Sequence, residues 1–492
     1  MIRAYAVADV RAVEDAAMAQ LPEGALMARA ARGLAKVVRA RLRERDGTRV
    51  VALVGAGNNG ADALYAVARL ARGGFDAAAV LTGVGPVHSG ARADAEQSGV
   101  VLLDGSASDE LGVDWASAIA NADVVVDGIT GIGGRPGLRV EARRWVSHIR
   151  PDTLVVSVDL PSGADPAGLV GATGADAVMA DETVTFGEPK PVHLLPATER
   201  ACGRLTIVDI GLDFSGCLPV VERLTPEDVR TRWPVPGPRD HKYTRGVLGV
   251  VAGTSAYPGA AVLSVLGALG TGPGMVRYHG PDDVRALVLA SAPEVVTAPG
   301  RVQAWVLGSG VDPTDPAAAP TCELITRALA DEAPAVVDAG ALALVAPRAA
   351  PTVLTPHAGE LATLLTRLTE REVGRPEVEA APLSAAREAA DTLGAVVVLK
   401  GATTLVVAPT AWTAPVRSQA DAPAWLATAG AGDVLAGVIG TLLAAGLPAL
   451  DAASLGVLVH GLAATRASSG GPLRASAVAE QLPTTIADLL RR

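Results

Sequence analysis

The sequence is poor in the residues that mark secreted, nucleic-acid-binding and membrane proteins. Only three cysteines occur among 492 residues, and no two of them form a CxxC pair. Cys202, Cys217 and Cys322 therefore predict neither a disulfide framework nor a zinc site. The first twenty residues, MIRAYAVADVRAVEDAAMAQ, carry charges throughout and lack an apolar core of signal-peptide length. We expect a protein of the reducing cytoplasm.

Positive charge is also in short supply. The chain has 42 Lys and Arg residues against 52 Asp and Glu residues, a formal net charge of −10. A nucleic-acid or anionic-membrane partner needs a concentrated basic surface, so neither is expected, and small-molecule chemistry is favoured. The apolar stretch from Val434 to Leu450 approaches membrane length, but Pro448 and three glycines interrupt it. We expect a buried helix there.

Lysine is the scarcest charged residue, with four among the 42 basic residues. Lys36 lies in a helical stretch and is expected on a solvated face. An ammonium group and a guanidinium group are not interchangeable beside a phosphate or a reacting group. Lys190, Lys242 and Lys400 therefore call for a chemical explanation, although Lys242 is equally well explained as a linker lysine.

Aromatic residues make up only 3% of the chain, whereas apolar residues make up 49%. Cores built from Val, Leu and Ala are typical of α/β proteins, and short β-branched runs that end in Gly or Asp alternate here with helical stretches. This order predicts two domains, each a mainly parallel sheet flanked by helices, with ligands at the carboxyl ends of the strands. We place the domains at 1–215 and 241–492, with a linker rich in Pro and charge at 216–240.

A glycine-rich helix start lies near the end of the chain, in TAGAGDVLAGVIGTLL (428–443). The first turn of a helix presents free N–H groups, and glycines let a charged ligand come close to them, so this stretch predicts an anion site. Asp433 is either a catalytic acid–base group or a helix cap, and the stretch alone leaves both interpretations open.

The first half contains a second glycine-rich turn, in VVALVGAGNNGADALYAVARLARGG. The pattern predicts a strand, a turn and a helix from about Ala61, but the spacing from Gly55 to Gly60 is wrong for a dinucleotide fingerprint. Asn58 and Asn59 either offer amide groups to a ligand or ion, or serve as turn residues that tolerate unusual backbone angles.

Four motifs in the order GNNG, DGITGIGG, DLPSG and FGEPKP resemble the NAD(P)H-hydrate epimerase domain, a Rossmann-like fold, over residues 1–215. The resemblance implies a potassium ion bound by Asn59, Asp127 and Ser162, which are hard oxygen donors. It also implies that Asp159 is the acid–base residue, which protonates the departing C6 hydroxyl and later accepts a proton from water. The implied dinucleotide cradle comprises Asn58, Asn59, Gly60, Ala61 and Asp62, together with Gly131, Ile132, Gly133, Gly134, Arg135, Pro136, Gly137 and Asp159.

Lys190 in FGEPKP would lie near Asp159, either as a phosphate partner or as a group that tunes the pKa of that carboxylate. A surface lysine is the alternative. The chain departs from the family pattern at Ala61 and Ala63, where the family has glycines, and the added methyl groups could crowd the phosphate or prevent a positive φ. Alanine is comfortable in a helix, so we expect the fold to be kept, whereas the effect on epimerase activity stays open.

From about residue 225 the chain resembles the ADP/ATP-dependent NAD(P)H-hydrate dehydratases, relatives of ribokinase-type kinases, through the motifs LGSGVD, TPHAGE, VVVLKGATT and AGAGD. The resemblance implies that Asp433 is the base that takes the proton of the substrate hydroxyl. It places the nucleotide at Lys400, Gly401, Ala402, Thr403, Thr404 and Gly432, and the hydrate at Ala260, Gly310, His357 and Asp433.

Two residues in TPHAGE have alternatives that the sequence leaves open. His357 could be a core histidine rather than a substrate contact. Glu360 could help to hold Mg²⁺ through water, or it could cap its helix in solvent.

Together the resemblances imply a bifunctional metabolite-repair enzyme. It would interconvert the R and S hydrates of NADH and NADPH (NADHX and NADPHX) and dehydrate the S form with ADP or ATP, releasing phosphate, with ADP as the usual nucleotide of this arrangement. We expect K⁺ in the first domain, Mg²⁺ in the second, and a cytoplasmic homo-oligomer. Two alternatives stay open: a ribokinase-type small-molecule kinase that forms a stable phosphorylated product, and a first domain that is only a binding or scaffold module.

Overall fold

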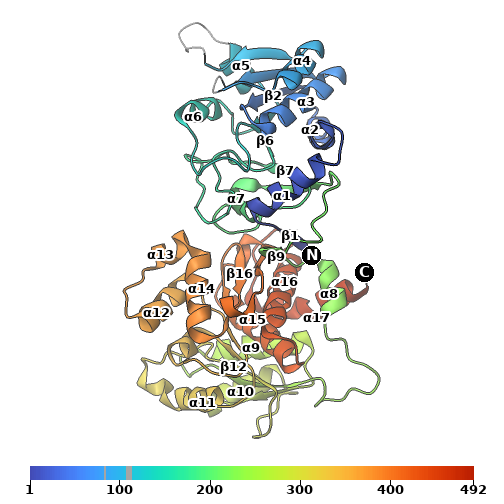
Figure 1. The fold of residues 1–492 in the computed structure, drawn as a ribbon. Coiled ribbons are helices and arrows are strands. Elements are labelled where there is room, and N and C mark those ends of the chain that lie inside the picture. The colour runs from blue at the N-terminus through green and yellow to red at the C-terminus, as the bar shows by residue number, and fades with distance from the viewer. Residues whose placement is uncertain (83–84, 107–113, 492) are drawn as a thin grey trace. The chain divides into compact units, whose positions relative to one another are not determined.

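The computed structural model describes residues 1–82, 85–106 and 114–491, and these divide into two compact units. One unit is Arg3–Val221, and the other joins Met1–Ile2 to Glu222–Arg492. Each unit consists of a sheet flanked by helices (Figure 1), which confirms the predicted fold class. Among the described residues, no helix combines the length and the apolar character that crossing a bilayer requires.

The described part of the first unit contains a seven-stranded sheet in the order β4-β3-β2-β5-β6-β7-β8, and its paired neighbours run parallel. The strands are β2 (Arg49–Val54), β3 (Asp76–Leu81), β4 (Val101–Asp104), β5 (Val124–Gly128), β6 (Leu154–Val158), β7 (Glu182–Phe186) and β8 (Arg204–Val208). The strand order reverses between β2 and β5. In open α/β sheets such a reversal opens a crevice at the carboxyl ends of the strands, where ligands bind.

Helices cover both faces of this sheet (Figure 1). They are α1 (Val7–Met18), α2 (Ala25–Glu44), α3 (Asn58–Arg72), α4 (Ser89–Gln97), α5 (Asp114–Ala120), α6 (Val140–Val146) and the short α7 (Glu199–Cys202). Because side chains alternate along a strand, Val50 and Ala52 of β2 pack under α2 and α3, whereas Val51 and Leu53 join Trp115 in the core on the other face. Two apolar layers therefore hold the strand ends in place.

The second unit contains a ten-stranded sheet among its described residues, in the order β1-β9-β17-β16-β15-β14-β13-β12-β10-β11. Its strands are β1 (Ile2–Ala4), β9 (Val221–Arg223), β10 (Val247–Val251), β11 (Met275–Tyr278), β12 (Ala304–Leu307), β13 (Ala335–Val337), β14 (Thr352–Leu354), β15 (Val396–Leu399), β16 (Thr404–Val407) and β17 (Val416–Gln419). The pairs from β11 to β15 are parallel, and β16 pairs antiparallel with both of its neighbours. The parallel part brings several strand ends to one edge.

The helices of the second unit are α8 (Pro226–Arg232), α9 (Pro258–Thr271), α10 (Asp282–Ser291), α11 (Ala319–Leu329), α12 (Ala358–Thr369), α13 (Arg375–Ala380), α14 (Pro382–Leu393), α15 (Ala431–Ala444), α16 (Ala449–Ser468) and α17 (Ala475–Arg491). The apolar stretch after Asp433 forms α15, which is buried along nearly its whole length, as predicted. Glycines let α9 and α15 come very close: a Cβ atom at Gly267 would lie 2.4 Å from the carbonyl oxygen of Val434, and one at Gly437 would lie 2.1 Å from that of Ser264.

The stretch 216–240, predicted as a linker, contains regular structure. It includes β9 and α8, and Leu224, Val229 and Trp233 are buried in the core of the second unit. Thr225 and Asp228 form a capping box at the start of α8, and the N-terminal amine lies 2.8 Å from Asp228. A three-residue strand and a seven-residue helix are too short to show a hydrophobic period, so the sequence pattern missed them.

Candidate active sites

In the first unit, Asp159 follows β6 with a positive φ of 66°, which is rare for a residue other than glycine. Backbone contacts on both sides hold this conformation: the N–H of Asp159 donates to the carbonyl of Val184 at 2.8 Å, and its carbonyl accepts from His193 Nε2 at 2.7 Å. Strained backbone that the surroundings hold in place is typical of functional sites.

The carboxylate of Asp159 is paired with Lys190. Lys190 Nζ lies 2.6 Å from Asp159 Oδ1, and the Thr185 hydroxyl donates to the same oxygen at 2.9 Å. Burial favours the neutral carboxyl, but Lys190 and Thr185 outweigh it, so the pKa of Asp159 is lowered. Lys190 is only 1% exposed, which contradicts the surface-lysine alternative. Its ammonium group is occupied by Asp159, Thr185 Oγ1 at 3.0 Å and the Phe186 carbonyl at 3.3 Å, which fits tuning of Asp159 better than phosphate binding.

His193 completes this cluster and was missed in the sequence. The backbone N–H of Lys190 donates to its Nδ1 at 2.9 Å, so the ring proton is on Nε2 and points to the Asp159 carbonyl. Burial, followed by the charge of Lys190, lowers the pKa of His193 to about 4, and the ring is therefore neutral. The only available signal was its place directly after FGEPKP, in FGEPKPVH.

The three residues expected to bind potassium lie around one group of oxygen atoms. Asp127, at the end of β5, accepts from the Ser162 hydroxyl at 2.6 Å and from the Ser162 N–H at 2.8 Å. The amide nitrogen of Asn59 donates to the carbonyls of Val158 at 2.6 Å and Thr130 at 3.3 Å. The Ser162 hydroxyl lies 3.3 Å from the same Thr130 carbonyl.

Asp127 is fully buried, and no cationic side chain pairs with it among the described residues. Burial raises its pKa, while the hydrogen bonds from Ser162 and Ser157 act in the opposite direction. A buried carboxylate surrounded by hydroxyl and carbonyl oxygens suits a hard cation. Within the described ranges, no cluster of three or more His, Cys, Asp or Glu side chains is arranged to hold a metal ion.

The first segment of the expected cradle is the start of α3, which begins at Asn58 rather than near Ala61. Asn58 and Asn59 are therefore helical residues, and the turn-residue alternative is wrong. A Cβ atom at Gly60 would lie 2.0 Å from the carbonyl oxygen of Gly55, so glycine is required there. Ala61 and Ala63 are fully buried, and neither has a positive φ. Their methyl groups pack in the core, so Ala61 can contact a ligand only through its backbone.

The second segment, 131–137, follows β5 and reaches the first one at Gly131. A Cβ atom there would lie 2.3 Å from Asn59 Oδ1, so the two segments meet closely only because Gly131 has no side chain. Gly133, Arg135 and Pro136 are exposed, whereas Gly131, Ile132, Gly134 and Gly137 are half-buried. The expected cradle residues are thus brought together at the carboxyl ends of β2 and β5.

In the second unit, α15 begins after Gly430, which has a φ of 88° and is the N-cap residue. No side chain caps this helix, which contradicts the capping alternative for Asp433. Burial, followed by the charge of Asp338, raises the pKa of Asp433 to about 7, although Lys400 and the Ser309 hydroxyl oppose the shift. A carboxyl group with such a pKa can accept a proton near neutral pH.

Lys400 ends β15 and lies beside this helix start. Its Nζ is 3.1 Å from Asp338 Oδ1 and 3.7 Å from Glu360 Oε2. Burial disfavours the charge of Lys400, but Asp338 and Glu360 outweigh it, so its pKa is raised. Residues 401–404 form the turn to β16, in which the Thr404 hydroxyl donates to the Gly401 carbonyl at 3.3 Å. The expected nucleotide residues therefore adjoin the start of α15.

Asp338 is a site residue that sequence reasoning missed. It follows β13, is 2% exposed, and accepts from Thr355 Oγ1 at 2.8 Å and from Ser309 Oγ at 2.9 Å. These bonds and Lys400 lower its pKa despite burial. The signal was present, since PAVVDAG is a β-branched run that ends in Asp, like the other strands of this chain.

His357 and Glu360 form a capping box at the start of α12. The N–H of Glu360 donates to His357 Nδ1 at 3.1 Å, and the N–H of His357 donates to Glu360 Oε2 at 2.7 Å. The side chain of His357 is 58% exposed, so the core-histidine alternative is wrong, while the capping alternative for Glu360 is observed. His357 Nε2 lies 3.7 Å from Glu360 Oε1, and the exposed ring is accessible to a ligand.

Ala260 lies in the first turn of α9, the helix that follows β10, and Gly310 lies on the loop after the neighbouring strand β12. Gly310 has a φ of 67°, and a Cβ atom there would lie 2.5 Å from the Cβ of Ala260. The carboxyl ends of β10, β12, β13 and β14 therefore carry Ala260, Gly310, Asp338 and His357 in turn. Four adjacent strands therefore lead to three of the four expected hydrate residues, together with Asp338, at one edge of the sheet.

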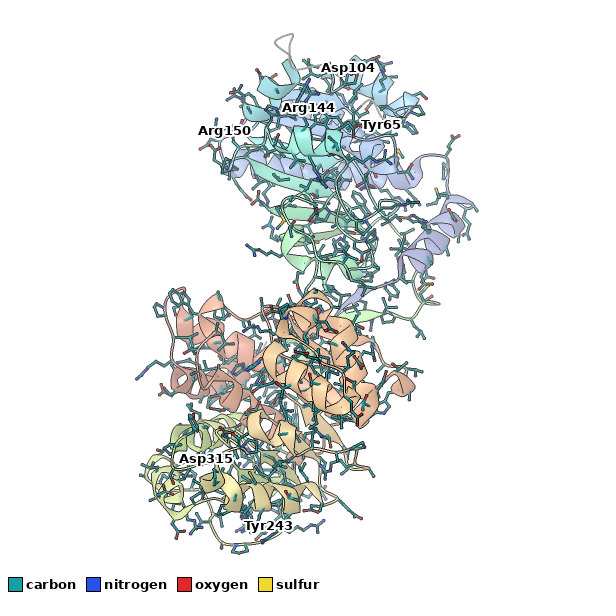
Figure 2. All side chains as sticks on the ribbon, turned by 90° about the vertical axis from the view of Figure 1, so that its left-hand side faces the viewer. Tyr65, Asp104, Arg144, Arg150, Tyr243 and Asp315 are labelled. Atoms are coloured by element: carbon teal, nitrogen blue, oxygen red, sulfur yellow. The ribbon has the colours of Figure 1, made fainter. Side chains whose placement is uncertain are left out.

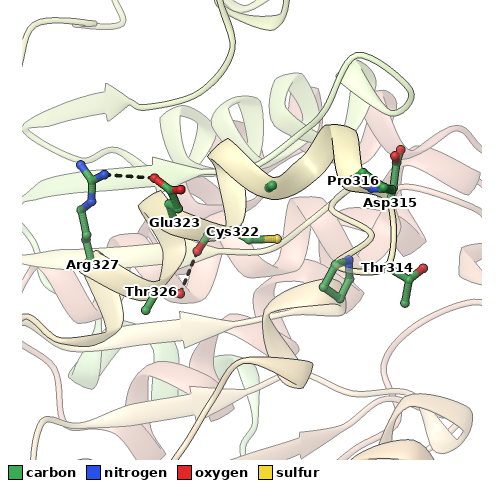
Figure 3. Close-up of a pocket in the computed structure, with 9 residues that line it drawn as sticks. Thr314, Asp315, Pro316, Cys322, Glu323, Thr326 and Arg327 are labelled. Atoms are coloured by element: carbon green, nitrogen blue, oxygen red, sulfur yellow. Dashed lines mark hydrogen bonds and ion pairs between the residues drawn. The ribbon is translucent and has the colours of Figure 1, made fainter.

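Two surface pockets lie away from these residues. One, of about 720 Å³, is lined by loop and α11 residues that include Asp315, Cys322 and Arg327 (Figure 3). The other, of about 290 Å³, contains Arg49 and Arg150 at the amino ends of the strands of the first unit, the edge opposite Asp159; Figure 2 labels Arg150. Neither pocket contains an expected site residue.

The two units, each with a buried carboxylate at the carboxyl edge of a mainly parallel sheet, define a two-domain α/β enzyme. Residues 23–192 match the family described as YjeF-related protein N-terminus, and residues 248–486 match that described as NAD(P)H-hydrate dehydratase. The chain is 45% identical over 467 residues to the bifunctional NAD(P)H-hydrate repair enzyme Nnr of Mycobacterium tuberculosis, covering 92% of this chain and 91% of that one. It is 41% identical over 509 residues to the enzyme of the same name from Mycobacterium leprae, covering 99% of both. The chain belongs to the family of bifunctional NAD(P)H-hydrate repair enzymes.

Each half also has a separate relative. An NAD(P)H-hydrate epimerase of Clavibacter sepedonicus is 43% identical over 227 residues, which are 44% of this chain and 93% of that protein. A crystal structure of the ADP/ATP-dependent NAD(P)H-hydrate dehydratase from Bacillus subtilis, co-crystallised with ATP and Mg²⁺, is 27% identical, covers 54% of this chain and 97% of that one, and has a TM-score of 0.48. The predicted family, with its epimerase and dehydratase activities, is confirmed. These matches support it rather than the ribokinase-type kinase alternative.

Proposed function

We propose that the chain repairs hydrated NADH and NADPH at two separate sites. Residues around Asp159 in the first unit interconvert the R and S hydrates, and residues around Asp433 in the second unit dehydrate the S hydrate with ADP or ATP. The observation that carries the proposal is the start of α15, a glycine-rich helix start that no side chain caps. There the carboxyl group of Asp433, with a pKa of about 7, lies beside the ammonium group of Lys400 and the free N–H groups of the first turn.

The second site suits phosphoryl transfer. Asp433 takes the proton of the C6 hydroxyl as the hydroxyl oxygen attacks the terminal phosphoryl group, and the N–H groups at the start of α15 and Lys400 stabilise the developing negative charge. Phosphate then leaves C6 with the C–O bonding electrons while the ring nitrogen lone pair forms a C=N bond. Loss of a proton from C5 restores the dihydropyridine. Phosphorylation thus converts a poor leaving group into a good one.

Two metal ions belong to this proposal. In the first unit, Asn59, Asp127 and Ser162 would hold K⁺ together with the Thr130 and Val158 carbonyls, and rotation of the Asn59 amide would turn its oxygen toward them. The ion would neutralise the buried carboxylate of Asp127 and attract the substrate pyrophosphate. In the second unit, Mg²⁺ would arrive with the nucleotide phosphates, and Glu360 is positioned beside Lys400 to contact it through water.

The proposal is tested by incubating a mixture of R and S hydrates with ADP or ATP and Mg²⁺ and following the dihydronicotinamide absorbance. Full recovery, with one phosphate released per NADH, is the expected result. Recovery of the S fraction alone would mean that the first unit is a binding or scaffold module. A stable phosphorylated product without free phosphate would support the kinase alternative and overturn the dehydratase assignment.

A further inference from the structure

Asp62 is a buried acidic residue near Asp159. It belongs to the cradle segment at the start of α3, and the sequence predicted only that the backbone of this segment contacts a phosphate. Asp62 is 7% exposed, and its Oδ1 is buried without a hydrogen-bond partner among the described residues. Leaving a carboxyl oxygen buried and unpaired costs stability, so such a group in a native fold calls for a functional reason.

The helix directs Asp62 toward the reacting end of the site. Asn59, three residues earlier and on the same face of α3, donates to the carbonyl of Val158, the residue directly before Asp159. Two charged groups affect the pKa of Asp62: Asp159, and Glu14 of α1. Both are acidic. No cationic group is paired with Asp62 among the described residues, in contrast to Asp159, which has Lys190.

The surroundings of the two carboxyl groups therefore differ: Asp159 is paired with Lys190 at 2.6 Å, whereas Asp62 Oδ1 is buried without a partner. Burial, followed by the charges of Asp159 and Glu14, raises the pKa of Asp62 well above its ordinary value. The ammonium group of Lys190 keeps the pKa of Asp159 low. Two carboxyl groups whose environments drive their pKa values apart are the usual arrangement for an acid and a base in one site.

We propose that Asp62 is the proton donor of the epimerase reaction and that Asp159 is its base. The neutral carboxyl group of Asp62 gives its proton to the C6 hydroxyl, the C6–O bond breaks, and water leaves while the ring nitrogen lone pair forms a C=N bond to C6. A water molecule then attacks C6 from the other face, and Asp159 takes its proton. The reverse reaction uses the same groups with their roles exchanged, and a proton returns from Asp159 to Asp62 through water to restore the starting state.

This assignment rests on the proposed epimerase function, and it changes one expected role. Asp159 was expected to protonate the departing hydroxyl itself, but a carboxylate that is paired with a buried lysine has no proton to give at neutral pH. With Asp62 as the donor, Asp159 begins each turnover in the form that a base requires. The departing and entering oxygens leave and approach on opposite faces of the ring, so each carboxyl group serves one face.

The test compares the full-length enzyme with its Asp62→Asn and Glu14→Gln variants, using pure R hydrate without nucleotide so that the second unit does not act. Asn is isosteric with the neutral carboxyl group, and we expect Asp62→Asn to lower the epimerisation rate by roughly 10²- to 10⁴-fold with little change in KM. Dehydration of S hydrate with ADP or ATP and the melting temperature should be unchanged, which excludes misfolding. Glu14→Gln is the matched control and should retain most of the activity.

Oxygen exchange in H₂¹⁸O, measured together with the dissociation constant of the hydrate, separates proton donation from binding. In Asp62→Asn, exchange of the C6 hydroxyl oxygen should fall together with epimerisation, because the ionised Asp159 has no proton to give to the departing oxygen, whereas affinity for the hydrate should be retained. Normal epimerisation in Asp62→Asn would overturn the proposal, as would a loss of affinity for the hydrate, which would assign Asp62 to binding. If the wild-type enzyme does not epimerise at all, the proposed function fails instead.

Discussion

The side chain of Lys400 lies against the backbone of Gly432, so that a Cβ atom at Gly432 would be 3.1 Å from Lys400 Nζ. The lysine directly follows a strand and the glycine lies in the first turn of a helix, so the contact joins the end of β15 to the start of α15. A compact ammonium group fits this space beside the helix start while it pairs with Asp338. The larger guanidinium group, which this chain uses nearly everywhere else, would not.

Asp433→Asn should separate catalysis from helix capping. Because no side chain caps α15, the change should not lower the melting temperature, while turnover of S hydrate should fall by roughly 10²- to 10⁴-fold, the usual contribution of a positioned base. Nucleotide affinity, measured by calorimetry, should be retained because Lys400 and the backbone N–H groups are intact. Unchanged turnover in the folded variant would remove Asp433 from the mechanism.

The pH dependence of dehydration should reflect the same residue. Asp433 acts as a base only when ionised, and its pKa is about 7, so kcat should rise as the pH increases through about 7. The stability effect has the opposite sign. The folded protein binds a proton at Asp433 more tightly than the unfolded chain does, so this group's contribution to stability falls between about pH 4 and pH 7.

Asp433→Asn is the control for both effects. The variant should lose that part of the pH dependence of unfolding, measured by denaturant titration at several pH values. A wild-type kcat that is flat between pH 6 and pH 8, with chemistry shown to be rate-limiting, would contradict the assignment.

Lys190→Met should be strongly destabilising, because it leaves the buried carboxylate of Asp159 without its partner. Breaking a buried ion pair typically costs about 3–5 kcal/mol of unfolding free energy. Asp159 should then titrate at higher pH, and epimerisation should be lost. In the double variant Lys190→Met/Asp159→Asn, much of the stability should return, since no charge is buried alone. Additive losses in denaturant unfolding would mean that the two side chains do not interact energetically.

Asn59→Ala should weaken the binding of the potassium ion that supports epimerisation, because it deletes one oxygen ligand and frees the carbonyls of Val158 and Thr130. The measurement is the epimerisation rate as a function of K⁺ concentration, with Na⁺ at constant total ionic strength. We expect a higher half-saturating K⁺ concentration than in the wild type. Asn121→Ala is a suitable control, since Asn121 is exposed and lies near the amino ends of the strands, away from the site. Wild-type activity in K⁺-free buffer would argue against the site.

Local pattern was enough to predict the strand ends and their chemistry. Asp127, Asp159 and Lys400 all follow β-branched runs, and parallel strands bring such residues to one edge whatever the details of packing. The fold class followed from the same alternation. Asp338 obeys the same rule and was predictable from it, although it lies outside the motifs that carry the family resemblance.

Properties that depend on three-dimensional neighbours could not be read from the chain. The ionised state of Asp159 depends on Lys190, 31 residues later, and the unpaired state of Asp62 depends on which groups are absent around it. The orientation of His193 depends on two backbone groups that come together only in the fold. The start of α3 was misplaced by three residues, since two asparagines and a glycine are weak helix formers that tertiary contacts overrode.

The contact between α9 and α15 fixes the position of the first turn of α15. Part of the geometry of the dehydratase site therefore depends on atoms that do not contact a ligand. Gly437 lies one turn beyond Asp433, and a methyl group there would collide with the backbone of α9 at Ser264. To make room, α15 would have to move, and its first turn would move with it. Gly437→Ala should therefore reduce turnover although it adds a favourable helix former in the interior of a helix. In a chain with so few aromatic residues, the accuracy of the catalytic geometry depends on how closely two bare backbones can pack.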